Sequence, residues 1–269
     1  MPNLPTEFLA CPSRSSEWIT PGMKLQAAAE RVINRTLAYV GLRLQRVAND
    51  LAHAPTLDGA LFRIARRTTT LATIVDIGAS DGRWSAQAMQ RFPHAQYLLV
   101  EAQSVHQRAL QRFVIRHRNA RFVLAAAGDM VGSVRFEATD DPFGGRASKE
   151  PLAVPGIEVP MTTIDALVSE YQLPPPFCLK LDVHGFELPI FQGAISTLRQ
   201  TALIVVECYA FRFADNLLIH EMIAHMEGLG FRCIDLIDPL YRPRDGAFWQ
   251  ADLFFVPSDQ QVFTFEQYQ

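Results

Sequence analysis

Charged residues interrupt an apolar segment in the second half of the chain. Within Phe177–Val183 (FCLKLDV), Lys180 and Asp182 lie two positions apart, so they share one face of the expected strand, and His184 extends that face if the strand continues. Charged side chains in such a segment are costly unless they are paired or functional. We interpret Asp182 as a site residue or as a structural cap of the turn at Gly185.

A second carboxylate, Glu207, stands near the end of the next apolar segment, Ala202–Tyr209 (ALIVVECY). Because parallel strands end at one edge of a sheet, Asp182 and Glu207 are expected to face one another across a crevice. Together with the His184 imidazole they can orient an acceptor hydroxyl or remove its proton, with His184 as a candidate general base. In the alternative interpretation, His184 is an ordinary loop residue and Glu207 pairs with Lys180.

The same carboxylates can also hold a divalent cation, which lowers the pKa of a bound hydroxyl. Oxygen ligands from Asp182 and Glu207 suit Mg²⁺ that keeps several waters. The sequence does not identify the remaining ligands, so metal dependence stays open.

A glycine-containing turn follows the first apolar segment. Asp76–Gly82 (DIGASDG) joins a predicted strand, Leu71–Ile77, to a predicted helix over 82–91. Glycines there let the backbone approach a ligand closely. The next strand ends at Glu101, whose carboxylate can accept hydrogen bonds from both ribose hydroxyls of a nucleoside. The full set of expected binding residues is Asp76, Gly78, Ala79, Ser80, Gly82, Glu101, Ala102, Ala127 and Asp129, the last as an acceptor for the adenine amino group.

The spacing of this turn separates two kinds of nucleotide. A dinucleotide site needs G-x-G-x-x-G to rest a pyrophosphate on a helix N-terminus, whereas this turn is D-x-G-x-x-x-G. Its acids, Asp76 and Asp81, are poor neighbours for a pyrophosphate but suit a sulfonium cation and its ammonium group. No Tyr-x-x-x-Lys pair supports hydride transfer. S-adenosylmethionine is therefore the expected cofactor, in preference to NAD.

These motifs belong to a longer ordered series. The series comprises Asp76–Gly82 with Ser85, Glu101, Thr163–Asp165, Lys180–Glu187 (KLDVHGFE), Phe191–Ala194 and Ile204–Glu207. In this order the sequence resembles the FkbM methyltransferases, from about residue 70 to 257. His184 departs from the pattern, because such proteins usually carry an acid before this glycine. The resemblance implies a class I methyltransferase that transfers a methyl group to a hydroxyl of a sugar or another secondary metabolite.

Alternating strands and helices predict how these residues are positioned. The predicted strands are 71–77, 96–101, 121–126, 177–183, 202–209, 231–237 and 251–256, with helices between them. This pattern predicts an α/β, Rossmann-like, seven-stranded and mostly parallel sheet with helices on both faces and a ligand at the carboxyl ends of the central strands. We expect residues 70–269 to form this domain and residues 1–69 to form an arm and a helical extension.

Two loops are candidates for acceptor recognition. The first, Asp140–Ser148, combines glycines with Phe143 and Arg146, and is interpreted as an acceptor-binding loop or lid or, alternatively, as an ordinary surface hairpin. The second, Asp238–Trp249, mixes aromatic residues and arginines and is equally interpretable as a long connection. Arg212 and Phe213 are further candidates for the acceptor side.

Composition narrows the possible partners. The 269 residues carry a formal net charge of −3, which gives no basic footprint for nucleic acid. We expect no secretory signal and, because the sequence has no uncharged apolar stretch of about 18 residues, no membrane-spanning segment. The cysteines, at positions 11, 178, 208 and 233, lack metal-site spacing, and the last three lie in predicted buried strands, which predicts reduced core thiols in a cytoplasmic protein. A predicted basic helix, Lys24–Val47, is a cover helix or, alternatively, a peripheral membrane contact.

Two other function classes remain as alternatives. A binding or scaffold protein without activity could keep this fold, and the unusual His184 favours that interpretation. A nucleotide-dependent oxidoreductase could use a similar sheet, but the missing dinucleotide motif argues against it. The sequence predicts no oligomeric state.

Overall fold

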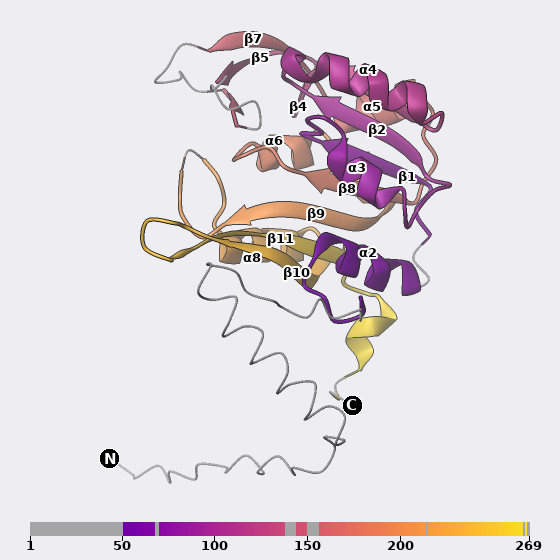
Figure 1. The fold of residues 1–269 in the computed structure, drawn as a ribbon, viewed down its shortest axis with the longest axis vertical. Coiled ribbons are helices and arrows are strands. Elements are labelled where there is room, and N and C mark those ends of the chain that lie inside the picture. Colours follow the sequence, from indigo (N-terminus) through magenta and orange to yellow (C-terminus); the bar gives the residue numbers. More distant parts are fainter. Residues whose placement is uncertain are drawn as a thin grey trace, which may run out of the picture. The chain divides into compact units, whose positions relative to one another are not determined.

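The computed structural model describes residues 51–67, 70–137, 144–149, 156–213, 215–265 and 267. A seven-stranded sheet runs through them (Figure 1). In spatial order its strands are β10 (Phe231–Tyr241), β11 (Phe248–Pro257), β9 (Thr201–Tyr209), β8 (Phe177–Leu181), β1 (Thr73–Ile77), β2 (Gln96–Glu101) and β3 (Ala120–Leu124). The five strands from β9 to β3 are parallel, and β11 and β10 are antiparallel. This arrangement confirms the predicted Rossmann-like, mostly parallel sheet.

The strand order places a crevice beside β1. The chain passes from β1 outward to β2 and β3, and later returns to β8 on the other side of β1. Ligands of open α/β sheets bind at such a reversal, outside the carboxyl ends of the strands. Asp76 in β1 and Lys180 in β8 are register partners next to this crevice.

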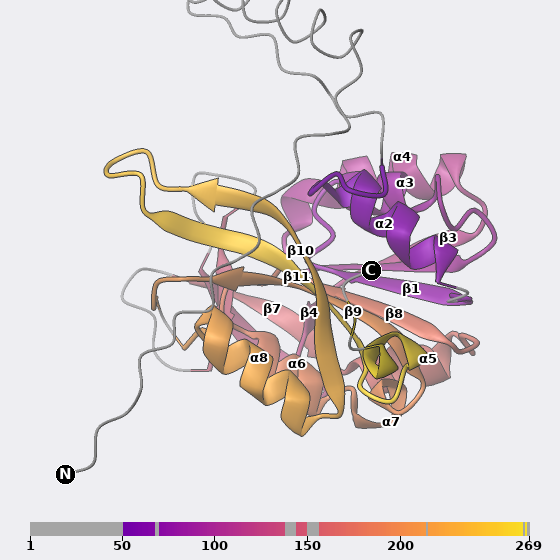
Figure 2. The same ribbon diagram turned by 90° about the horizontal axis from the view of Figure 1, so that it is seen from below.

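Helices cover both faces of the sheet (Figure 2). One face carries α2 (Leu57–Arg66), α3 (Arg83–Ala88) and α4 (Gln107–Arg116), and the other carries α5 (Ile164–Glu170), α6 (Glu187–Gln192), α7 (Ile195–Leu198) and α8 (Ile219–Gly228). Two apolar cores result, because successive strand side chains point to opposite faces. Phe254 and Phe255 join different cores, for example. Burial on both faces explains why the central strands β1, β2, β8 and β9 are mostly apolar.

A second sheet of four strands is the main element that the sequence pattern does not predict. It consists of β4 (Ala126–Ala127), β7 (Ile157–Thr162), β5 (Gly132–Glu137) and β6 (Arg146–Ser148), in that order. In β5 and β7 only alternate residues are buried, so each strand contributes few apolar residues. That weak signal, in a segment rich in Gly, Asp and Pro, conceals the strands. β5 pairs antiparallel with both β6 and β7.

Two other predicted elements differ in extent. The helix expected between the strands 177–183 and 202–209 is divided into α6 and α7 at Gly193, where an added Cβ would lie 1.9 Å from the Gly128 carbonyl oxygen. The long connection considered for Asp238–Trp249 is half strand, because β10 continues to Tyr241 and β11 begins at Phe248.

The helix α2 lies N-terminal to the predicted domain boundary and packs on the sheet. Ala60, Leu61 and Ile64 are buried, and Arg63 Nε lies 2.7 Å from Asp235 Oδ2 of β10. The boundary at residue 69/70 remains a prediction, and the predicted helix Lys24–Val47 falls outside the described residues.

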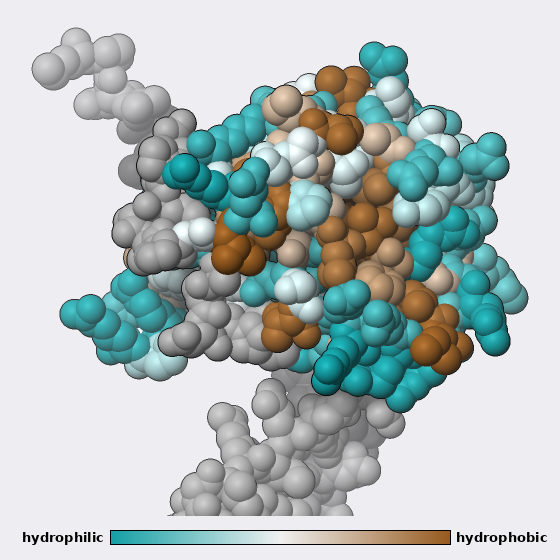
Figure 3. Space-filling view, turned by 90° about the horizontal axis from the view of Figure 1, so that it is seen from above, coloured by the Kyte–Doolittle hydropathy of each residue, from teal (hydrophilic) through white to brown (hydrophobic). Residues whose placement is uncertain are grey.

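Three observations concern the expected membrane contact, the molecular surface and the cysteines. Within the described part of the chain, no helix has the length and apolar character needed to cross a membrane. Figure 3 shows a face with apolar residues in a band across its middle, bordered by hydrophilic ones. Exposed apolar residues are normal on folded proteins, and we assign no partner to this face. Cys178 and Cys208 are buried free thiols, as predicted.

Candidate active site

A cavity of about 580 Å³ lies at the carboxyl ends of β1, β2 and β8. Six residues predicted to bind the cofactor line it, namely Gly78, Ala79, Ser80, Glu101, Ala102 and Ala127. Lys180, Asp182 and His184 line the same cavity. The structure therefore brings most of the predicted binding residues together with two of the predicted catalytic ones.

The Glu101 carboxylate is held by two backbone groups. The Ser80 N–H donates to Glu101 Oε2, and the Gln103 N–H donates to Oε1, each at 2.7 Å. The turn that presents Ser80 requires left-handed backbone at Gly78 (φ +74°) and at Ser80 itself (φ +51°). Each carboxylate oxygen has a further lone pair, so the fixed carboxylate can still accept hydrogen bonds from a ligand.

Three predicted binding residues do not line the cavity. Asp76 is fully buried behind the turn, where its carboxylate accepts from Ser85 Oγ at 2.7 Å. Gly82 faces the core, because an added Cβ there would lie 2.8 Å from the Phe113 ring. Asp129 forms an ion pair with Lys149. Asp76 and Gly82 thus shape the turn rather than border the space for a ligand.

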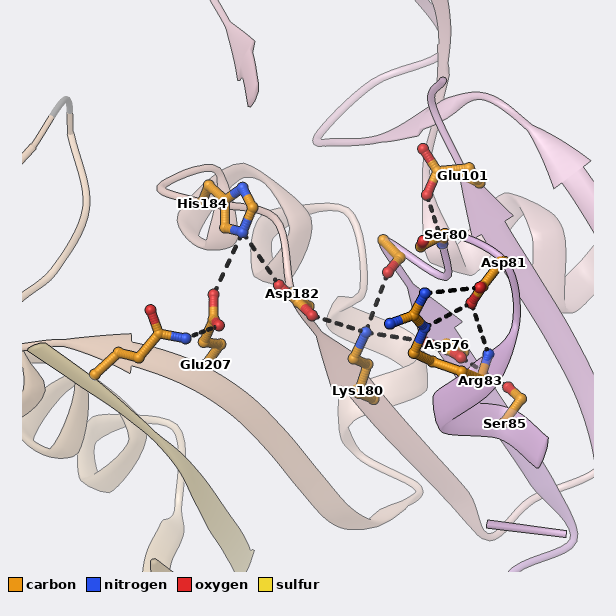
Figure 4. Close-up of polar contacts among 12 residues, drawn as sticks. Asp76, Ser80, Asp81, Arg83, Ser85, Glu101, Lys180, Asp182, His184 and Glu207 are labelled. Atoms are coloured by element: carbon orange, nitrogen blue, oxygen red, sulfur yellow. Dashed lines mark hydrogen bonds and ion pairs between the residues drawn. The ribbon is translucent and has the colours of Figure 1, made fainter. Parts of the chain in front are cut away.

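Lys180 connects the turn to the predicted catalytic residues (Figure 4). Its Nζ lies 3.1 Å from Asp76 Oδ1 and 3.3 Å from Asp182 Oδ2, and it donates to the Gly78 carbonyl at 3.1 Å. Burial opposes the charge on Lys180, but the two carboxylates outweigh it and raise its pKa. Lys180 is therefore the partner of Asp76 and Asp182, and the alternative of a Lys180–Glu207 pair is not observed.

His184 brings the two carboxylates of the adjacent strands together (Figure 4). Its Nε2 lies 3.4 Å from Asp182 Oδ1 and 3.4 Å from Glu207 Oε2. These three residues can each offer one ligand atom within 4.8 Å of the others, a spacing that can hold a metal ion. The structure thus places the imidazole nitrogen beside the two carboxylate oxygens considered from the sequence.

The loop that carries His184 is fixed by a different acid. His184 (φ +54°) and Gly185 (φ +102°) both adopt left-handed backbone immediately after β8. The Gly185 N–H donates to Glu187 Oε1 at 2.9 Å. Glu187, not Asp182, therefore accepts from the backbone of the glycine in this turn, which leaves Asp182 free to face the cavity.

Asp182, His184 and Glu207 together are called the cluster below, and their pKa values reflect burial and mutual charge. Burial lowers the pKa of His184, but hydrogen bonds with Asp182 and Glu207 outweigh burial and raise that pKa to about 10. Burial raises the pKa of Asp182, yet nearby Lys180 holds it well below its usual range. Burial also raises the pKa of Glu207. Held between two carboxylates, the imidazole carries a proton at neutral pH and cannot accept another one in that form.

A second cavity of about 340 Å³ adjoins the first. It is lined by Glu137, Gly145, Arg146, His184, Tyr209, Phe213, Trp249 and Gln250, of which Gly145 and His184 also line the first cavity. The Phe213 and Trp249 rings are nearly parallel, at 14°, with centroids 6.3 Å apart. The predicted acceptor segment contributes Gly145 and Arg146, whereas residues 140–143 lie outside the described part.

Sequence reasoning missed two partners of Glu207. Tyr209 donates its hydroxyl to Glu207 Oε2, and Gln250 donates its amide to Oε1. Tyr209 could have been found, because it follows Glu207 by two positions and so shares its face of β9. Gln250 had no such local signal, since it arrives through the antiparallel pairing of β11 with β9.

Comparison with known proteins identifies one family. The family model of the methyltransferase FkbM domain matches residues 76–233. The match spans more than half of the chain and includes the cavity turn, Glu101 and the three residues of the cluster. No curated protein matches the sequence.

Solved structures of low sequence identity resemble the chain. The FkbM methyltransferase of Methylobacillus flagellatus has 14% identity and a TM-score of 0.46, and the match covers 68% of this chain but 44% of that one. A precorrin-6y C5,15-methyltransferase of Geobacter metallireducens has 13% identity and a TM-score of 0.41, and the match covers 74% of this chain and 86% of that one. The 1,6-didemethyltoxoflavin-N1-methyltransferase of Burkholderia thailandensis was solved with 1,6-didemethyltoxoflavin and S-adenosylhomocysteine. It has 12% identity and a TM-score of 0.42, and the match covers 91% of this chain and 93% of that one.

Proposed function

The chain belongs to the FkbM methyltransferase family, and on that premise we propose that it transfers the methyl group of S-adenosylmethionine to a hydroxyl oxygen of a sugar or another secondary metabolite. The observation that carries this proposal is the meeting of two cavities at Gly145 and His184. One cavity contains the predicted donor-binding residues, and the other is suited to an acceptor. A methyl donor in the first cavity and an acceptor in the second could therefore meet beside His184.

The donor cavity offers groups that suit S-adenosylmethionine. Glu101, fixed by two N–H donors, would accept hydrogen bonds from the ribose hydroxyls. Ala102 and Ala127 give an apolar wall for the adenine. Asp182, whose low pKa keeps it ionised, supplies negative charge that favours a sulfonium cation.

The acceptor cavity combines ring faces with polar side chains. Tyr209, Phe213 and Trp249 present aromatic surface, and Gln250, Glu137 and Arg146 present hydrogen-bonding groups. Such a mixed lining fits a ligand that has apolar faces and polar edges, such as a sugar ring. The acceptor hydroxyl would then point towards His184, which borders both cavities.

The transfer breaks the bond between sulfur and the methyl carbon as the bond from the acceptor oxygen forms. The sulfonium becomes a neutral thioether, and the hydroxyl proton must leave. Glu207, whose pKa is raised by burial and whose Oε2 contacts His184 and Tyr209 of the second cavity, would receive that proton. Alignment of donor and acceptor supplies much of the remaining acceleration, since effective molarities of about 10⁵ M or more are reached by well-oriented groups.

The test is calorimetric titration of the full chain with S-adenosylmethionine and S-adenosylhomocysteine. We expect Glu101→Ala to weaken both Kd values at least about 30-fold, because two or more charge-assisted hydrogen bonds are lost. The matched control is Glu158→Gln, since Glu158 is an exposed carboxylate of β7 that does not line the donor cavity. Absence of binding in the unmodified chain would contradict the proposal.

The other function classes give different outcomes in the same experiments. Binding of S-adenosylmethionine without methyl transfer to a broad panel of hydroxyl acceptors would favour a binding or scaffold protein. Binding of NAD in place of S-adenosylmethionine would favour an oxidoreductase. We also propose a cytoplasmic location, supported by the buried free thiols of Cys178 and Cys208.

A further inference from the structure

We propose that Asp182, His184 and Glu207 form the binding site of a divalent transition-metal ion at the junction of the two cavities. Binding of the ion stands on the geometry of these side chains alone. Its role in methyl transfer rests on the function proposed above.

The ligand atoms converge from two elements. Asp182 and His184 come from the loop after β8, and Glu207 comes from the neighbouring strand β9. His184 Nε2 lies 3.4 Å from an oxygen of each carboxylate. Ligand atoms bonded to one ion at about 2.0–2.2 Å are separated by about 3 Å, so a small movement of the side chains would enclose an ion.

Each of the three ligands is oriented by another group, as is usual for residues that bind metals. The Nδ1 of His184 lies 3.1 Å from the Gly145 carbonyl oxygen, an arrangement in which Nδ1–H donates and Nε2 is left for a metal. Lys180 holds the other oxygen of Asp182, and Gln250 donates to the other oxygen of Glu207. Tyr209 also donates to Glu207 Oε2, which keeps a second lone pair for coordination.

The charge of the site favours a divalent ion. Asp76, Asp182 and Glu207 supply three carboxylates, and Lys180 supplies one ammonium group that contacts two of them. With the imidazole protonated, this group keeps one uncompensated negative charge, and when an ion takes the place of the Nε2 proton the ligand group has two. A divalent ion would neutralise them in a partly buried site, where unpaired charge is costly.

The donor set indicates which ion. One imidazole nitrogen and two carboxylate oxygens are a mixed set that suits Mn²⁺, Fe²⁺, Co²⁺ or Zn²⁺ better than an all-oxygen ion such as Ca²⁺. Three protein ligands leave positions open for water and for an acceptor hydroxyl, as in catalytic metal sites. When bound, the ion would lower the pKa of that hydroxyl and help it to lose its proton to Glu207 or to water.

The proposal is tested with Mn²⁺ as the probe. The purified full chain is stripped with a chelator, dialysed and titrated with Mn²⁺, while electron paramagnetic resonance measures the free ion. We expect one saturable site per chain. The isosteric variants Asp182→Asn and Glu207→Gln should weaken its Kd at least about 10-fold, whereas Glu158→Gln should leave it unchanged.

A second measurement reports the nitrogen ligand. The visible spectrum of the Co²⁺-loaded chain should change in His184→Ala, and circular dichroism would show that each variant is folded. If the imidazole serves only as a protonated partner of the carboxylates, Mn²⁺ will not bind saturably or the variants will bind it as the unmodified chain does. Either result overturns the metal site.

The two proposals can fail separately. Glu101→Ala should lose S-adenosylmethionine and keep Mn²⁺, because Glu101 lies outside the cluster. Saturable Mn²⁺ binding without S-adenosylmethionine binding would leave the metal site standing and contradict the proposed function. The reverse result would remove only the metal.

Discussion

Lys180 lies directly opposite Asp76 in the register of β8 and β1, and its Nζ is 3.1 Å from Asp76 Oδ1. The side chain of Asp76 is 0% exposed and that of Lys180 is 7% exposed. Lys180 also contacts Asp182 and the Gly78 carbonyl. One buried ammonium group therefore contacts both the turn Asp76–Gly82 and Asp182, which is one of the residues proposed to act on the acceptor.

Replacement of this lysine should destabilise the fold. Lys180→Met leaves the buried Asp76 carboxylate without its cation, and we expect the free energy of unfolding to fall by about 3–5 kcal/mol. Urea unfolding followed by circular dichroism measures this change. The control is Arg83→Met, which breaks the exposed Arg83–Asp81 pair and should cost less than about 1 kcal/mol. Equal losses in the two variants would show that the Lys180 pair has no special structural role.

The turn at Gly78 should not tolerate a side chain. An added Cβ would lie 2.0 Å from the Asp182 carbonyl oxygen, and the backbone φ is +74°. We expect Gly78→Ala to lower the free energy of unfolding by at least about 2 kcal/mol and to abolish S-adenosylmethionine binding in calorimetry. Gly132→Ala is the control, because nothing lies within 4 Å of its added Cβ. Normal binding by the Gly78 variant would refute the assigned role of this turn.

Trp249 should affect the acceptor without affecting the donor. It lines the second cavity and stacks near Phe213. We expect Trp249→Leu to raise the acceptor KM about 10-fold, since loss of a stacking face costs about 1–1.5 kcal/mol, and to leave the S-adenosylmethionine Kd unchanged. Transfer of a labelled methyl group to the best acceptor of a sugar panel measures KM. Tyr241→Leu, at an exposed ring of β10, should change neither value. An unaltered KM in the tryptophan variant would place the acceptor elsewhere.

Removal of the proposed ion should stop transfer and spare donor binding. After chelation and dialysis we expect turnover to fall at least about 100-fold, because the acceptor hydroxyl loses its Lewis acid. Mn²⁺ should restore turnover in the unmodified chain but not in Glu207→Gln. The Kd for S-adenosylmethionine, measured by calorimetry, should stay within about a factor of two. Full turnover in the chelated chain would contradict a catalytic role for the ion.

Some features of the site could be predicted because they depend on local pattern. The strands that carry Asp76, Glu101, Lys180 and Glu207 are largely buried on both faces, so each one is a mostly apolar run with its charged residue within its last three positions. The position of each charged residue near a strand end then follows from chain order. The strands of the seven-stranded sheet could be predicted for the same reason, because a buried strand is marked by its own apolar residues.

Other features could not be predicted because distant segments create them. The strands of the small sheet are buried on one face only, so each has too few apolar residues to be recognised from its sequence. Gln250 reaches Glu207 only because β11 pairs with β9. The left-handed backbone of His184 depends on the turn that Glu187 fixes.

By itself, the sequence determined the sheet, the turn Asp76–Gly82 and the candidate residues Asp182, His184 and Glu207. Only the tertiary structure decided that Lys180 pairs with Asp76 and Asp182, that one imidazole lies between two carboxylates, and that two cavities meet at His184. The physical reason is that periodicity fixes which face a side chain takes within its own strand. Strand register and loop conformation, which set the distances between side chains of different strands, arise from packing among segments far apart in the chain.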